Sequence, residues 1–210
     1  MCGRFAQAQL DWPSYFELFG DLQSPDIPVS YNIKPTQDIA MAYRRNGEMM
    51  TASARWWFVP HWHRGGVKDW KATTFNAKIE TAHEKPAFRT AWRQSRCIIP
   101  TTGYYEWTGP KGKKQPHYIT VEQNVPVFFF AGLYSTLGDG TQTTTILTQN
   151  AAPEIVELHH RMPVILPIEQ IQDWLGCKDG NYGQDGGFKH RPVKAFGMKD
   201  DGLELIAPFG

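Results

Sequence analysis

The apolar run at residues 127–131 constrains the fold of this chain more than any other segment. It contains three consecutive phenylalanines and no polar residue, so a strand formed here is expected to be buried on both faces. Strands are predicted over residues 38–44, 50–58, 96–100, 117–121, 127–134, 143–148 and 164–166, and the segment 193–206 is expected to return to the sheet. Helices are predicted over residues 11–19, 86–94, 152–158 and 168–175. The helices are short, and strands dominate the pattern.

The length and composition predict one globular domain spanning residues 1–210. Hydrophobic residues make up 41% of the chain and charged residues 20%, which is typical of folded domains rather than disordered ones. No apolar segment approaches the ~20 residues of a membrane span, and the N-terminus lacks a signal-peptide run. Cys2, Cys97 and Cys177 are far apart, which argues against a disulfide framework or a zinc site. We expect a cytoplasmic protein in a reducing compartment, with no cofactor.

The cysteine that follows the initiator methionine carries the clearest chemical signal. Removal of Met1 would leave Cys2 with a free amine and a thiol on adjacent carbons, with pKa values near ~7.7–8 and ~8.5 when unperturbed. The amine can form a Schiff base with an aldehyde, and the thiol can then close a five-membered thiazolidine ring. The same pair also suits an N-terminal-nucleophile amidohydrolase. A third possibility is that Cys2 is an incidental residue near a chain end.

The segment between residues 55 and 97 is strongly basic although the net charge of the chain is only +1. It holds nine Lys or Arg residues against three acids, together with five of the eight tryptophans. Cations that follow phosphates and exposed rings that stack on bases are typical of single-stranded nucleic-acid surfaces. We expect Trp56, Trp57 and Trp92 to belong to the core, and Trp62 to be exposed. The histidines on either side of Trp62 are weak evidence for a metal site.

Two further segments carry candidate acid and base groups. Glu106 lies between aromatic residues, where burial could raise its pKa and make it a general acid or base. Strand alternation could equally turn Glu106 toward solvent. His159 and His160 precede Arg161, forming a candidate acid/base and phosphate-binding corner in which one histidine is expected to be structural.

Five motifs in order resemble the SRAP family, the SOS-response-associated peptidase-like proteins. The resemblance extends from residue 2 to about residue 206. It rests on Met1-Cys2-Gly3-Arg4-Phe5, Tyr31-Asn32-Ile33-Lys34-Pro35, Phe75-Asn76-Ala77-Lys78-Ile79-Glu80-Thr81, Gly103-Tyr104-Tyr105-Glu106-Trp107 and Leu158-His159-His160-Arg161-Met162-Pro163.

The resemblance implies an α+β fold, in which a barrel-like, mainly antiparallel sheet is flanked by short helices. It also implies capture of abasic sites in single-stranded DNA by a monomeric, cytoplasmic protein that associates with the nucleoid when bound to DNA. Cys2 would form a thiazolidine crosslink with the abasic aldehyde, Asn76 would position the reacting groups, Glu106 would move protons, and His159 would assist opening of the sugar ring. The implied DNA contacts are phosphate contacts by Arg4, Lys78 and Arg161, and a path lined by Pro35, Trp62, Trp107 and Thr148. The family's peptidase label fits self-removal of a residue before Cys2.

This sequence departs from the family pattern at three places. Lys78 stands where some relatives have arginine, which keeps the charge but loses a bidentate phosphate contact. His63 stands where some members have a second tryptophan, and residues 196–198 read Phe-Gly-Met. The crosslinking hypothesis remains the leading one, ahead of an amidohydrolase or autopeptidase and of a passive single-strand binding module.

Overall fold

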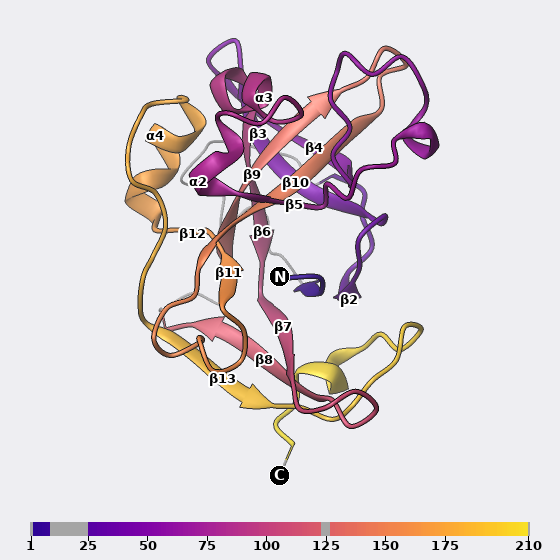
Figure 1. Ribbon diagram of the computed structural model, residues 1–210, viewed down its shortest axis with the longest axis vertical. Coiled ribbons are helices and arrows are strands. Elements are labelled where there is room, and N and C mark those ends of the chain that lie inside the picture. The colour runs from indigo at the N-terminus through magenta and orange to yellow at the C-terminus, as the bar shows by residue number, and fades with distance from the viewer. Residues whose placement is uncertain (1, 9–24, 123–126, 210) are drawn as a thin grey trace.

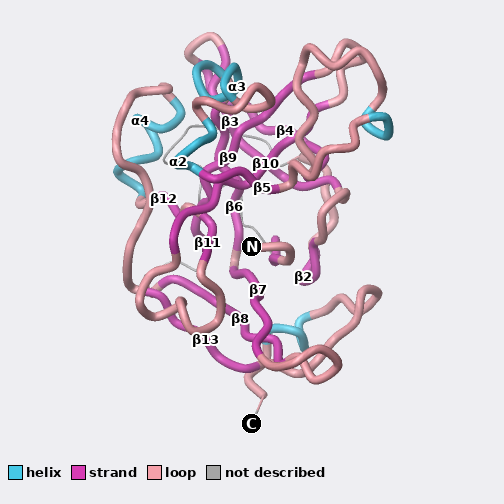
Figure 2. The backbone as a smooth tube through the Cα atoms, viewed as in Figure 1, coloured by secondary structure: helices cyan, strands magenta, loops and turns pink. Residues whose placement is uncertain are grey.

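The computed structural model describes residues 2–8, 25–122 and 127–209 (Figure 1). Its strands are β1 (Phe5–Gln7), β2 (Ser30–Ile33), β3 (Asp38–Arg45), β4 (Glu48–Trp56), β5 (Asn76–Lys78), β6 (Arg96–Thr101), β7 (Gly103–Thr108), β8 (Gln115–Val121), β9 (Phe128–Thr136), β10 (Gln142–Asn150), β11 (Arg161–Pro163), β12 (Ile165–Leu166) and β13 (Phe188–Pro192). The α-helices are α2 (Ile79–Ala82), α3 (Arg89–Gln94) and α4 (Ile171–Leu175), and the 3₁₀ turns are η1 (Val67–Asp69), η2 (Ile168–Gln170) and η3 (Leu203–Ile206). Strands form most of the interior, and the helices lie at the periphery (Figure 2).

The larger sheet closes on itself as a ring of strands. Its order is β11-β10-β4-β3-β6-β9-β12, and β9 also pairs with β10, so that β10, β4, β3, β6 and β9 form a circle. β10 runs parallel to β4 and to the short strand β5, whereas the other pairs are antiparallel. The expected α+β fold with a mainly antiparallel sheet is therefore confirmed.

The second sheet carries the start of the chain. Its order is β13-β8-β7-β1-β2, with every pair antiparallel, and it lies below the ring in Figure 1. β1 lies between β2 and β7, with Phe5 opposite both Ile33 and Tyr104. The start of the described chain is therefore fixed by strand pairing on both sides of β1.

Phe5 anchors the start of the chain in the core. Its ring makes edge contacts with Trp56 at 5.0 Å and with Phe130 at 5.7 Å, and the side chain is fully buried. Full burial of a phenylalanine contributes about 1.5–3 kcal/mol. Phe130 belongs to the apolar run at 127–131, which is buried on both faces as expected. Trp56 is also a core residue, as predicted, whereas Trp57 and Trp92 are half-buried.

Two predicted elements are wrong. Residues 152–158 form successive turns instead of a helix, because the segment connects two paired strands and the backbone hydrogen bond from Ala151 to His160 folds it back toward β11. Most of 193–206 also leaves the sheet: β13 ends at Pro192, and only Val193 makes an isolated bridge, to Pro208. Gly202, at φ 157°, turns the chain into η3. The predicted helix at 11–19 lies outside the described residues.

The other predicted elements are found with small boundary shifts. The strand predicted at 50–58 is β4, which ends at Trp56, and the helix predicted at 86–94 is α3, which begins at Arg89. The predicted helix at 168–175 divides into η2 and α4. No helix in the described part of the chain is both long and apolar enough to cross a membrane.

Candidate functional site

Cys2 is fully buried among core residues of both sheets, three residues before β1. Its backbone carbonyl accepts a hydrogen bond from the Asn76 side-chain amide, with Nδ2 and the oxygen 2.6 Å apart. Its thiol makes a weak 3.8 Å contact with the Arg4 carbonyl. Burial raises the pKa of the thiol, so the resting side chain is protonated at neutral pH.

Asn76 reaches Cys2 because β5 pairs in parallel with β10. This pairing sets Asn76 opposite Ile146 and Lys78 opposite Thr148. The Asn76 Nδ2 is used on the Cys2 carbonyl, whereas its buried Oδ1 has no hydrogen-bond partner among the described residues. An acceptor thus remains available beside the first residue of the described chain.

Glu106 brings a carboxyl group to the same place. It lies on β7, whose pairing with β1 aligns the two strands next to Cys2, and its side chain is only 6% exposed. Burial raises the pKa of the Glu106 carboxyl to about 7, and its charge in turn raises the pKa of the Cys2 thiol. The alternative that strand alternation turns Glu106 to solvent is wrong. Near neutral pH the carboxyl can either donate or accept a proton.

His159 follows the turns at 152–158 and is held by backbone contacts. Its Nδ1 lies 3.0 Å from both the backbone nitrogen and the carbonyl oxygen of Arg161, and its ring stacks on His160 at 4.4 Å. Burial lowers the pKa of His159, and the positive charge at the amino terminus lowers it further. The same charge acts on Glu106. His159 is therefore neutral at physiological pH and electrostatically linked to the start of the chain.

Trp62 and Lys78 line one pocket together with Asn76. The pocket has a volume of about 490 Å³. Trp62 is 50% exposed, as predicted, and its ring rests edge-on against Trp70 at 5.7 Å. Lys78 is exposed, and Lys85 adds a second cation to the lining. The exposed Trp62 ring and the Lys78 and Lys85 side chains thus line a pocket that also reaches Asn76. Asn76 is the residue that hydrogen-bonds to Cys2.

Arg4 and Trp107 contact each other. The Arg4 guanidinium lies 5.5 Å from the centre of the Trp107 ring and donates a 2.5 Å hydrogen bond to the Asn32 side chain. Its second nitrogen lies 3.1 Å from the Met198 sulfur, so the Met198 departure places a thioether against this cation. Pro35 is half-buried in the turn between β2 and β3, and no contact places it with the others.

Arg161 and Thr148 are inside the fold. The Arg161 side chain is 6% exposed and forms a two-pronged ion pair with Glu80, at 2.6 and 2.8 Å, and also bonds to Asn150 and to the Thr148 carbonyl. The Thr148 hydroxyl is fully buried, with the Ala77 carbonyl 3.4 Å away. Both terminal nitrogens of Arg161 are thus occupied in this structure, its buried Nε has no hydrogen-bond partner among the described residues, and contact of either residue with DNA remains a prediction.

A comparison with protein families decides where the chain belongs. The family model described as SOS response associated peptidase (SRAP) matches residues 1–193. The chain is a member of the SRAP family.

Named SRAP relatives and solved structures extend this match. The chain is 30% identical to the abasic site processing protein YedK of Escherichia coli, over 99% of this chain and all of that protein. It is 33% identical to the abasic site processing protein YoaM of Bacillus subtilis, over 85% of this chain and 81% of that one. A crystal structure of a protein from Bordetella bronchiseptica matches with a TM-score of 0.75 at 28% identity, over 92% of this chain and all of that one.

Sequence reasoning missed two residues of this SRAP site. Tyr104 precedes Glu106 by two positions on β7, so both side chains leave the same face of the strand. Its hydroxyl is buried and has no hydrogen-bond partner in the described part of the chain. Burial raises the pKa of Tyr104, and charges on Cys2 and Glu106 add to the shift, which places the phenol in their cluster. The period of two along β7 was a signal that could have identified it.

Glu80 is the second missed residue. It is the partner of Arg161, and that ion pair holds the pKa of its carboxyl below the usual value. Its place within the Phe75–Thr81 motif was the available signal. Among the described residues, no group of three or more His, Cys, Asp or Glu side chains converges in the way that a metal site requires.

Proposed function

We propose that this SRAP protein captures abasic sites in single-stranded DNA by forming a covalent bond between Cys2 and the ring-opened sugar. The similarity to YedK and YoaM, which are named abasic site processing proteins, supports this class of substrate. The observation that carries the proposal is the convergence of Asn76 and Glu106 on Cys2. Asn76 donates a 2.6 Å hydrogen bond to the Cys2 backbone carbonyl, and the charge of the buried Glu106 carboxyl acts on the Cys2 thiol.

The reaction begins at the amine that removal of Met1 creates. The Cys2 nitrogen attacks the C1′ aldehyde carbon and forms a carbinolamine. Protonated Glu106 gives its proton to the carbinolamine hydroxyl, which leaves as water, and an iminium remains. The Cys2 thiol then passes its proton to the Glu106 carboxylate, and the sulfur adds to the iminium carbon to close the thiazolidine. Glu106 thus ends protonated, as it began.

Two neighbouring groups support this sequence of steps. The unpartnered Oδ1 of Asn76 is an acceptor for an N–H of the Cys2 amine, which would direct the nitrogen lone pair toward the aldehyde. His159 is neutral, so it can accept the proton of the sugar hydroxyl as the ring opens.

The DNA strand is proposed to approach through the pocket that Trp62 and Lys78 line. The half-exposed indole offers a face for base stacking, and the exposed ammonium groups of Lys78 and Lys85 offer phosphate contacts. An abasic nucleotide needs no base to be unstacked before its sugar reaches Cys2.

The test is a denaturing gel, together with an intact-mass measurement, after the protein is incubated with single-stranded DNA that carries one abasic site. Wild type and Cys177→Ala, a matched control for a half-buried cysteine away from the cluster, are expected to give a heat-stable shifted band with Met1 absent from the mass. Cys2→Ala is expected to give none. The absence of any shift, despite confirmed loss of Met1, would overturn the proposal.

The same preparation tests the two alternatives. Turnover of glutamine or short peptides at enzyme-like rates would favour an N-terminal-nucleophile amidohydrolase. Unchanged DNA binding and biological function in Cys2→Ala would instead favour a passive binding module.

A further inference from the structure

The segment at residues 196–201, which follows β13, is held against β2 and the turn after it. The Asn32 side chain on β2 donates a 3.1 Å hydrogen bond to the Gly197 carbonyl. Lys34, just after β2, donates a 2.5 Å hydrogen bond from its ammonium group to the Met198 carbonyl. The backbone on either side of the Met198 side chain is therefore anchored to the part of the fold that also holds the start of the chain.

Met198 is the most exposed methionine of the described part of the chain. Its side chain is 63% exposed, compared with 40% for Met50, whereas Met41 and Met162 are fully buried. Oxidants in solution convert accessible methionines to methionine sulfoxide, which replaces an apolar side chain with a polar one. The exposure of Met198 therefore makes it the first methionine that such an oxidant would reach.

The Met198 sulfur meets a guanidinium that has few other partners. It lies 3.1 Å from Nη2 of Arg4, and a thioether is only a weak hydrogen-bond acceptor. Nη1 of Arg4 donates a 2.5 Å hydrogen bond to Asn32, and the buried Nε has no partner among the described residues. Nε and Nη2 together form an edge that can bind a phosphate through two parallel hydrogen bonds. One of these two nitrogens thus faces the sulfur of Met198.

The charge of Arg4 is partly buried and lacks a counter-ion. No carboxylate among the described residues pairs with it, and the guanidinium lies instead 5.5 Å from the centre of the Trp107 ring and 5.9 Å from that of Phe196. Burial lowers the pKa of Arg4. Hydrogen bonds from a charged donor are about twice as strong as those between neutral groups, and partial burial strengthens them further. An oxygen atom placed next to Nη2 would therefore bind it firmly.

Oxidation of Met198 would place such an oxygen there. A hydroperoxide transfers one oxygen atom to the sulfur: a sulfur lone pair forms the S–O bond, the O–O bond of the peroxide breaks, and the remainder leaves as water or an alcohol. The sulfur is oxidised and the peroxide is reduced, so the step needs no other reactant. The sulfoxide oxygen carries partial negative charge and accepts hydrogen bonds that a thioether accepts only weakly.

We propose that Met198 is an oxidation site whose sulfoxide oxygen bonds to Arg4 and competes with a DNA phosphate for it. The inference rests on the proposed function, because it assigns Arg4 to a phosphate of the bound strand. Peroxide would then weaken the binding of single-stranded DNA. The lysines of the pocket that Trp62 and Lys78 line keep their charges, so binding is reduced rather than abolished.

The test measures noncovalent binding of a single-stranded oligonucleotide before and after brief treatment with hydrogen peroxide. The full chain carries Cys2→Ala and Cys177→Ala, so oxidation of these two thiols cannot contribute, and Cys97 is buried. Peptide mass mapping is expected to show the gain of one oxygen at Met198 before the other methionines react. The dissociation constant is expected to rise by about tenfold on oxidation, the effect of one hydrogen bond to a charged group.

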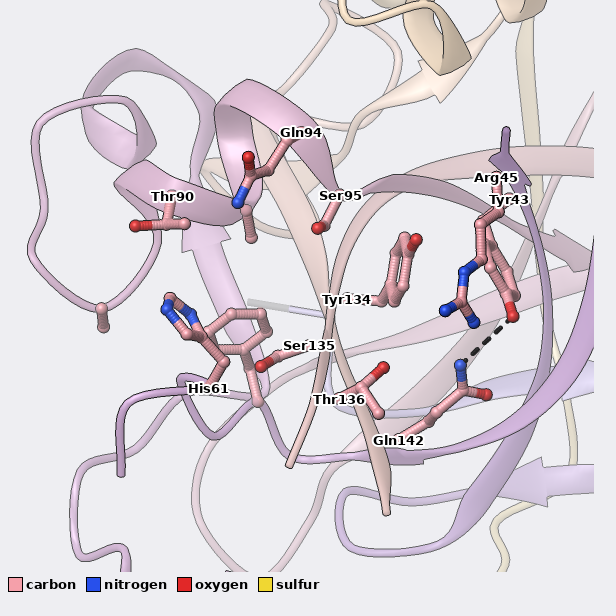
Figure 3. A pocket seen from close by; sticks show the side chains of 13 residues that line it. Tyr43, Arg45, His61, Thr90, Gln94, Ser95, Tyr134, Ser135, Thr136 and Gln142 are labelled. Atoms are coloured by element: carbon pink, nitrogen blue, oxygen red, sulfur yellow. Dashed lines mark hydrogen bonds between the residues drawn. The ribbon is translucent and has the colours of Figure 1, made fainter. Parts of the chain in front are cut away.

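Two leucine variants assign the effect to one methionine. Met198→Leu removes the sulfur but keeps an apolar side chain of similar volume, so its dissociation constant is expected to be the same before and after peroxide. Met50→Leu is the matched control and is expected to lose affinity on oxidation as its parent does. Met50 is exposed on β4, and its sulfur accepts no hydrogen bond from any described residue. It lies opposite Tyr43 in the part of the ring that Figure 3 shows.

A glutamine variant tests the acceptor without an oxidant. Met198→Gln offers an amide oxygen to Arg4, so it is expected to bind the oligonucleotide more weakly than Met198→Leu and to be insensitive to peroxide. The unfolding temperature of the parent protein is measured before and after treatment and is expected to be unchanged, because Met198 lies at the surface. A drop in that temperature that accompanies the loss of affinity would assign the effect to unfolding and overturn the proposal.

Two further results would also overturn it: an equal loss of affinity in Met198→Leu, or complete oxidation of Met198 with no change in the dissociation constant. Failure of the proposed function has a different signature. In that case the wild type forms no Cys2-dependent crosslink with abasic DNA even before any oxidation.

Discussion

The side-chain amide of Asn76 and the backbone carbonyl of Cys2 are joined by a 2.6 Å hydrogen bond across 74 residues of sequence. The bond uses a backbone group of Cys2, so it survives removal of Met1 and leaves the thiol and the new amine unconstrained by it. It therefore ties the position of the nucleophile to β5, and through β5 to the ring of strands.

Asn76→Asp is expected to slow crosslinking by about tenfold or more. The substitution keeps the shape of the side chain but replaces the amide donor with an acceptor that faces the Cys2 carbonyl. The measurement is the rate of band formation with abasic single-stranded DNA under single-turnover conditions. Asn181→Asp, on an exposed loop, is the control and is expected to react like wild type. An unchanged rate in Asn76→Asp would remove Asn76 from the positioning role.

Glu106→Gln is expected to slow thiazolidine formation by about a hundredfold or more while leaving noncovalent DNA affinity intact. In the wild type, the rate is expected to fall as the pH rises through about 7, because the carboxyl loses the proton that it donates to the leaving hydroxyl. The variant has no such carboxyl, so this limb of the pH profile is expected to disappear. Retention of the limb in Glu106→Gln would assign it to another group.

The same substitution is expected to stabilise the fold at alkaline pH. The Glu106 pKa is raised from 4.5 to about 7 on folding, so between these values the folded chain holds a proton that the unfolded chain releases. Wild-type stability therefore falls as the pH rises through this window, by up to about 2–3 kcal/mol. Urea unfolding of Glu106→Gln is expected to lack this decline, and a parallel decline in both proteins would contradict the prediction.

Glu80→Gln is expected to lower the free energy of unfolding by about 1–2 kcal/mol near neutral pH, because it leaves the buried Arg161 without its carboxylate. The estimate is modest because Glu80 itself is 44% exposed. Its pKa is lowered in the fold, so the stabilisation is present above the unfolded value of 4.5 and is lost as the pH falls. Urea unfolding should distinguish the variant from wild type at neutral pH, and the difference should shrink as the pH falls below the unfolded value of 4.5 and through the lowered folded pKa. Glu157→Gln, an exposed control, should match wild type across this pH range.

Lys78→Gln is expected to weaken noncovalent binding of single-stranded DNA and to lower the salt dependence by about 0.7, the slope for one phosphate contact. The charge is exposed in the pocket beside Trp62, so the loss should not reduce stability. Lys113→Gln, in the turn between β7 and β8, is the control. A salt slope equal to wild type in Lys78→Gln would exclude this phosphate contact.

Much of the sheet could be predicted from local pattern because its strands are apolar runs bounded by turn residues. β3, β6, β9 and β10 lie close to their predicted positions. The segments that failed, 152–158 and 193–206, have few buried residues, so their conformation depends on what they bridge. The parallel pairing of β10 with β4, which completes the ring, joins strands that are far apart in the sequence, and no local pattern encodes it.

Some residues of the candidate site could likewise be predicted from the sequence, and others could not. Cys2 and Glu106 could be singled out from their chemistry and their neighbours in the sequence. The burial of Arg161 could not, because an arginine beside two histidines is usually exposed, and its partner Glu80 lies 81 residues away. Tyr104 could have been found from its alternation with Glu106, but a tyrosine in an aromatic strand is usually a packing residue.

The parallel pairing of β5 has a consequence for which DNA sequences the protein would accept. Asn76 and Lys78 are two residues apart on one face of this strand, a fixed separation of about 6.6 Å along the backbone. Under the proposed function, one of them holds the nucleophile and the other contacts a phosphate. The protein would then recognise the lesion by the distance from the abasic sugar to a phosphate. A sugar and a phosphate are present at every nucleotide. Such a protein would crosslink an abasic site whatever bases flank it.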